Sequence, residues 1–158
     1  MKPALIHRVF QLLVGLWLGT ILSVGYLVAP VIFTKLPDRQ LAGLIAGEIF
    51  SITTTMTIVL GVVLLGLSNW QVSRGFAKYR QIRWFVLLIL LFAIGGSLMQ
   101  LWMMDLKRLA SIEGVVVMQS TYATPFARLH GISSVLFLLE SVVGLITFWK
   151  LTNITKAD

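Results

Sequence analysis

Residues 126–149 read FARLHGISSVLFLLESVVGLITFW, and this stretch decides the fold class. It is apolar enough to cross a bilayer, which takes about 20 residues. Yet its polar residues include His130, Ser133, Ser134, Glu140 and Ser141. At about 100° per residue these positions share one side of a helix. Lipid offers no favourable contact to a polar side, so we expect it to face other protein inside the membrane.

Three further apolar segments precede this one. Of the 158 residues, 58% are hydrophobic and 12% are charged, whereas about one-quarter of a soluble domain is charged. Backbone groups must be paired in lipid, so each segment is expected to be a helix. The predicted fold class is all-α, an integral membrane four-helix bundle that forms one transmembrane domain over residues 1–158. The helices are predicted at about residues 9–33, 41–67, 84–104 and 129–149.

The first segment follows a positively charged start that resembles a signal peptide. Its apolar run of about 22 residues exceeds the roughly 7–15 of a cleavable core, so we expect a retained helix. Pro30 lies near its end and has no backbone N–H to donate. We therefore predict a kink there that frees the carbonyl of Tyr26.

Basic residues predict the orientation of the helices. The connection 68–83 is rich in Lys and Arg and contains no acid, which is typical of a cytoplasmic loop. With the N-terminus inside, the cytoplasmic side holds Lys2, Arg8, Arg74, Lys78, Arg80, Arg83, Lys150 and Lys156. The other side, which includes the long connection 105–128, holds Lys35, Arg39, Lys107, Arg108 and Arg128. Eight cations against five, of 13 in all, favour both termini in the cytoplasm.

Glycines mark the helix faces that are expected to pack. Gly15 and Gly19 are spaced by four residues on the first helix, as are Gly43 and Gly47 on the second, and Gly96 lies on the third. This spacing lets two helix backbones approach closely. We expect these glycines to line helix contacts, within the bundle or with another membrane protein.

Polar residues of all four helices fall at similar depth in the outer half of the membrane. They are Tyr26, Glu48, Gln100, His130 and Ser134. The inward sides of a helix bundle converge, so the sequence predicts a polar pocket built from these residues. Glu140 lies deeper and is expected to contribute less.

Three interpretations of this pocket stay open. His130 could pair with Glu48 or a serine in a structural hydrogen-bond network. The pocket could instead be a pathway for a small molecule, proton or ion, because intramembrane carboxylates often mark one. The third interpretation is metal or haem binding by His130 with Met99, Met103 or Met104, since thioether ligands suit Cu(I).

Enzymatic motifs are missing from the sequence. The chain has no cysteine, which excludes disulfides, thiolate metal sites and cysteine nucleophiles. It also lacks a phosphate-binding loop, an HExxH motif and a nucleophile elbow. A non-enzymatic role without a cofactor is therefore favoured. The net charge of +7 is carried by short connections, which favours anionic lipid over nucleic acid as its partner.

The segment His130-Gly131-Ile132-Ser133-Ser134, preceded by Phe126 and Arg128, resembles the transmembrane protein 205-like family, also called domain of unknown function 4149. Residues 17–19 (WLG) and 28–33 (VAPVIF) resemble the family's opening helix, and residues 41–50 resemble its second helix. The resemblance implies a four-helix protein of the bacterial inner membrane with no established activity.

We therefore expect a multi-pass protein of the bacterial inner membrane that acts as an accessory or structural subunit of a membrane assembly. Its expected partners are the lipid bilayer, other membrane-protein subunits or a second copy of itself. The alternative is a small transporter or a haem- or copper-binding protein that uses the outer pocket.

Overall fold

The computed structural model describes residues 3–154, and every regular element in that range is helical. The elements are α1 (Pro3–Ser23), a π-helical turn η1 (Val24–Val28), α2 (Ala29–Lys35), α3 (Arg39–Ser73), α4 (Tyr79–Ile112), a 3₁₀ turn η2 (Val117–Gln119) and α5 (Ala123–Ile154). Two residues of the predicted charge count, Lys2 and Lys156, lie outside this range.

Four helical segments are long and apolar enough to cross a membrane. They are Leu5–Lys35, Arg39–Ser73, Tyr79–Ile112 and Ala123–Asn153, of 31 to 35 residues each. At 1.5 Å per residue each is roughly 47–52 Å long, which exceeds a hydrocarbon core of about 30 Å. The helices therefore extend beyond the predicted apolar segments. The predicted connections 68–83 and 105–128 shorten to residues 74–78 and 113–122, because a helix can continue through the headgroup region.

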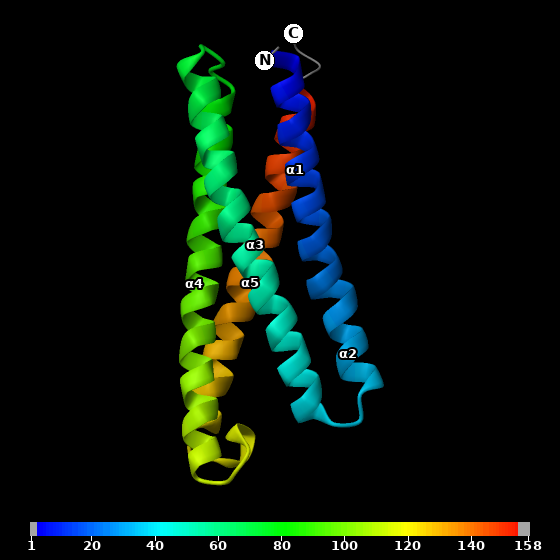
Figure 1. The fold of residues 1–158 in the computed structure, drawn as a ribbon, viewed down its shortest axis with the longest axis vertical. Coiled ribbons are helices and arrows are strands. Elements are labelled where there is room, and N and C mark those ends of the chain that lie inside the picture. Colours follow the sequence, from blue (N-terminus) through cyan, green and yellow to red (C-terminus); the bar gives the residue numbers. More distant parts are fainter. Residues whose placement is uncertain (1–2, 155–158) are drawn as a thin grey trace.

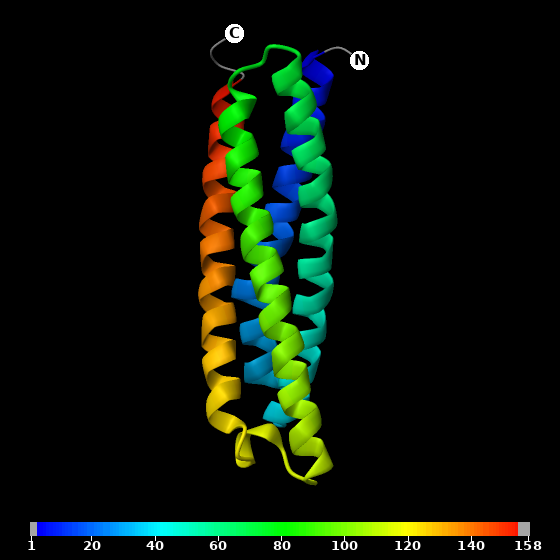
Figure 2. The same ribbon diagram turned by 90° about the vertical axis from the view of Figure 1, so that its left-hand side faces the viewer.

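The helices form an up-and-down bundle that is closed at one end and open at the other. α4 packs along both α3 and α5, while α1 packs against α5 and α3. The start of α1, the connection 74–78 and the end of α5 lie together at one end, which we call the closed half (Figure 1). In the opposite, open half, α2 and the first part of α3 lean away from α4 and α5 (Figure 1). Viewed from the side, all the long helices follow the long axis of the molecule (Figure 2).

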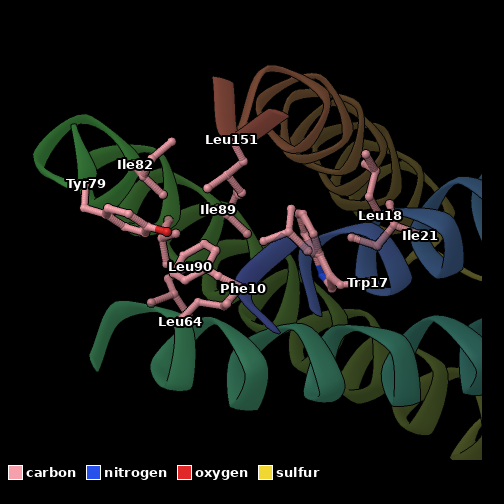
Figure 3. Close-up of a cluster of buried hydrophobic side chains, with 12 residues drawn as sticks. Phe10, Trp17, Leu18, Ile21, Leu64, Tyr79, Ile82, Ile89, Leu90 and Leu151 are labelled. Atoms are coloured by element: carbon pink, nitrogen blue, oxygen red, sulfur yellow. The ribbon is translucent and has the colours of Figure 1, made fainter. Parts of the chain in front are cut away.

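The hydrophobic core lies in the closed half. Helix α1 contributes five residues at helical spacing to this core, Phe10, Val14, Trp17, Leu18 and Ile21. Helix α4 contributes a matching face of Tyr79, Ile82, Val86, Ile89 and Leu90, with Leu64 from α3 and Leu151 from α5 (Figure 3). Spacings of three and four residues place side chains on one face of a helix, which explains how these helices close on each other.

Specific residues define the helix ends. The carboxylate of Asp38 accepts from the backbone N–H groups of Gln40 (2.8 Å) and Leu41 (3.2 Å), so it caps the start of α3. Gly75 and Gly114 have φ of +92° and +73° and follow the last turns of α3 and α4. A left-handed residue at this position is the usual way to end a helix, and glycine adopts it without strain.

The irregularity predicted before Pro30 takes the form of a π-helical turn. The N–H of Ala29 donates to the carbonyl of Val24, five residues back. Because Pro30 cannot donate, the ladder is already interrupted at this point, and η1 absorbs the interruption before α2 begins.

Candidate functional site

Three polar side chains from three helices meet at the centre of the bundle. The indole Nε1 of Trp17 on α1 donates to the hydroxyl of Thr57 on α3 at 2.9 Å. The Thr57 hydroxyl donates to the carbonyl of Thr53 at 3.0 Å, and the carboxyl of Glu140 on α5 lies beside this hydroxyl. Trp17, Thr57 and Glu140 are 7%, 1% and 5% exposed. We call these three residues the central cluster.

Small residues make room for this cluster. A Cβ built on Gly144 of α5 would lie 2.9 Å from Cζ3 and Cη2 of Trp17 and 3.0 Å from Leu18. Real Cβ atoms essentially never approach that closely. Gly144 therefore allows the indole of Trp17 to lie against the backbone of α5 while its N–H reaches across to α3.

Glu140 lies near mid-height of the membrane-spanning region. The neighbouring titratable residues on α5 are His130 towards the open end and Lys150 towards the closed end. Each is about 15 Å from Glu140 at 1.5 Å per residue, which is half the thickness of the hydrocarbon. The central cluster thus places a carboxyl where an uncompensated charge costs about 2.5–3.5 kcal/mol on insertion scales.

The surroundings of the cluster are tightly packed. The nearby hydroxyls of Ser141 and Thr147, both buried, donate to carbonyls in the preceding turn of α5 at 2.9 and 2.7 Å. A cavity beside Trp17 and Thr57 has a volume of about 10 Å³. That volume holds one water molecule at most.

The residues of the predicted outer pocket occupy the open half. Tyr26, Glu48, His130 and Ser134 are exposed, whereas Gln100 is half-buried. The side-chain amide of Gln100 on α4 donates to the carbonyl of Gly47 on α3 at 2.9 Å. His130 stacks on Phe126 of its own helix, and its carbonyl accepts from Ser134. The divergence of the helices therefore leaves these five residues without a shared enclosed site, and their common role stays a prediction.

A hollow of about 460 Å³ does exist at the open end, between α4 and α5. Its lining residues are Trp102, Asp105, Leu106, Thr124, Pro125, Arg128 and Leu129. None of the five predicted pocket residues lines this hollow.

The expected glycine contacts are found at only one of the five predicted positions. A Cβ on Gly15 would lie 3.2 Å from Phe148 of α5. Cβ atoms on Gly19, Gly43, Gly47 and Gly96 would meet nothing within 4 Å. Within the chain no neighbour packs against these four Cβ positions, which on α3 follows from the divergence in the open half, and their contact with another membrane protein stays a prediction. Close contacts occur instead at Gly25, Gly61 and Gly144.

Sequence reasoning missed two buried polar contacts. Thr57 lies 40 positions from Trp17, and the Nδ1 of His7 is 2.7 Å from the hydroxyl of Tyr79, 72 positions away. Helical periodicity gives no register between helices, so neither pair could be read from it. The one available signal was Glu140 itself, a carboxyl in the middle of an apolar helix, which we expected to contribute little.

Metal ligation finds limited support in the geometry. Within residues 3–154, no group of three or more His, Cys, Asp and Glu side chains is placed to hold a metal ion. Met99 and Met103 on α4 are half-buried, while His130 is exposed on α5. A site built from His130 and these methionines stays a prediction.

Comparison with known proteins places the chain in a family. The family model described as Domain of unknown function (DUF4149) matches residues 12–107, which run from within α1 to near the end of α4 and include Trp17 and Thr57. Neither the curated proteins nor the solved structures gave a match. The narrower link to transmembrane protein 205-like proteins stays a prediction. Because the match covers more than half of the 158 residues, the chain belongs to the DUF4149 family.

Proposed function

We propose that this protein is a structural or accessory subunit of a membrane assembly in the bacterial inner membrane, with both termini in the cytoplasm. The observation that carries the proposal is the packed centre of the bundle. Trp17 donates to Thr57, the carboxyl of Glu140 lies beside Thr57, and the adjoining cavity of about 10 Å³ is far smaller than a substrate. Polar groups used in this way hold helices together.

The open half supplies the surface for a partner. A Cβ added to Gly43 or Gly47 on α3 would meet no atom of another helix within 4 Å. Glycines spaced by four residues allow a further helix to pack closely. Leu44 is 53% exposed beside them, and the carboxylate of Glu48 is exposed one turn later. This part of α3 suits contact with protein better than contact with acyl chains.

A photocrosslinking residue at Leu44 tests the proposal in native membranes. Val62 is the matched control, because it is 59% exposed and, five helical turns from Leu44, lies on the same side of α3. We expect a protein adduct at Leu44 and only lipid adducts at Val62. The mass of the adduct distinguishes a second copy of this chain from another subunit. Lipid adducts alone at both positions would contradict the proposal.

Transport of protons or ions is a second candidate function, and Glu140 favours it. An intramembrane carboxyl often marks an ion pathway, and Glu140 is 5% exposed at mid-height of the bundle. Proton or cation flux into liposomes containing the purified protein, lost in Glu140→Gln, would support this candidate. Equal flux in both proteins, or in neither, would leave the structural role of Glu140.

Haem or copper binding through His130, Met99 or Met103 is tested by the same preparation. A Soret band or bound copper that disappears in His130→Ala would support it. Absence of both from freshly purified protein would end it.

A further inference from the structure

We propose that a groove between α4 and α5 in the closed half binds the headgroup of an anionic phospholipid. The groove has a volume of about 850 Å³. Its cationic lining residues are Lys78, Arg80 and Lys150, and its amide-bearing lining residues are Gln81 and Asn153. We call this feature the basic groove.

The depth of the basic groove matches that of lipid headgroups. Lys150 lies about 15 Å along α5 from Glu140, at the edge of a hydrocarbon core about 30 Å thick. Towards the membrane centre the lining becomes apolar, with Leu145 and Ile146. Trp149, which is 71% exposed, also lines the groove. Tryptophan is enriched at the membrane interface, so the lining changes from charged to aromatic to apolar as a phospholipid does.

Two of the groove's cations, Arg80 and Lys150, have no acidic side chain of residues 3–154 nearby. In the described part of the chain, Asp38, Glu48, Asp105 and Glu113 lie in the open half, and Glu140 lies at mid-height. Arg80 is exposed, and the ammonium of Lys150 is 3.5 Å from the amide oxygen of Gln81, a neutral group. A phosphate would therefore add a negative charge beside these two cations.

Lys150 connects the two walls of the groove. Besides Gln81, it lies over the ring of Phe85 on α4, with 5.6 Å between the ammonium and the ring centroid. The other cations at this end point to different partners. Arg83 donates to Asn69 on α3, and the guanidinium of Arg74 stacks on Trp70. The closed half thus contains cations inside and outside the groove, which allows a matched comparison.

Lipid titration of the full chain in neutral detergent tests the site. The measured quantity is the dissociation constant of phosphatidylglycerol, with melting temperature as a second readout. Each Lys or Arg near an anionic headgroup contributes about fivefold in affinity, so Arg80→Gln with Lys150→Gln should weaken binding roughly 30-fold. The control removes two cations outside the groove, Arg8→Gln with Arg74→Gln, and should change binding less than about threefold.

The following results of the lipid titration would overturn the proposal. Equal weakening in the two double variants would mean general attraction to a basic surface. Equal binding of phosphatidylcholine would remove the role of headgroup charge, and displacement by inorganic phosphate at the same concentration would indicate a soluble anion. Displacement of the lipid by an acidic peptide with higher affinity would indicate a protein partner. If the double variant does not fold, Arg80→Gln alone, an exposed position, should still show the fivefold loss.

Discussion

Replacing Gly144 by alanine perturbs the central cluster through a single methyl group. The new Cβ would lie 2.9 Å from two carbons of the Trp17 ring and 3.0 Å from Leu18. Carbon atoms prefer about 3.5 Å or more, so the ring must retreat by roughly 0.5 Å. It cannot do so freely, because its N–H is bonded to Thr57 at 2.9 Å on the opposite side.

The size of the effect follows from a comparison within α5. Inserting a methyl group into a packed core costs about 1–3 kcal/mol. A glycine-to-alanine change in a helix also gains about 1 kcal/mol from propensity. Gly131 lies on the same helix, and a Cβ there would meet nothing within 4 Å. The propensity gain cancels between the two sites, so Gly144→Ala should be less stable than Gly131→Ala by about 1–3 kcal/mol.

Unfolding in mixed micelles with a rising fraction of dodecyl sulfate measures this difference. Tryptophan fluorescence is a suitable signal because Trp17 is buried in the folded bundle. If the two variants unfold at the same detergent fraction, Trp17 does not rest on α5 at Gly144, and the packing described for the closed half is wrong.

Three further predictions concern other parts of the chain. Asp38→Ala should lower stability by about 1 kcal/mol by removing the cap of α3, whereas Asp38→Asn should keep most of it; equal losses in chemical unfolding would argue against the cap. Gln100→Leu should cost about 0.6 and at most about 1.7 kcal/mol, since it removes the bond to the Gly47 carbonyl across α3 and α4; wild-type stability would show that this bond contributes nothing. The Glu113 carboxylate raises the pKa of Tyr122. Any stability from this contact is therefore fully present below the pKa of tyrosine in the unfolded chain, near 10, and is lost as the pH rises through the higher pKa of Tyr122 in the folded protein. Ultraviolet titration should show a lower tyrosine midpoint in Glu113→Gln, and an unchanged midpoint would refute the contact.

Much of the architecture could be predicted from the sequence because lipid imposes it. Apolar runs of about 20 residues must be helices in a bilayer, so the number of spanning helices followed directly. The break before Pro30 and the helix start at Asp38 rest on local chemistry, and the structure has both features.

The pairing between helices could not be read in the same way. Periodicity indicates which side of a helix faces protein, but not which neighbour it meets or at what height. Glu140 therefore seemed peripheral to a pocket at Glu48 and His130, while in the structure it is buried and those two are exposed. The spacing of glycines likewise does not show which helix, if any, lies against them. Gly43 and Gly47 form the expected pattern but lie where α3 leans away, whereas the isolated Gly144 makes the close contact.

A double-mutant cycle on Trp17 and Thr57 tests most directly whether α1, α3 and α5 meet at the centre of the membrane. Trp17→Phe and Thr57→Val each remove one side of the 2.9 Å hydrogen bond while keeping an apolar shape. The free energies of unfolding of the wild type, both single variants and the double variant give the coupling between the two side chains. We predict a favourable coupling of about 0.6 and at most about 1.7 kcal/mol, the average and the maximum measured for hydrogen bonds between membrane helices. A coupling of zero would mean that the two side chains do not touch, and the central cluster would not exist as described.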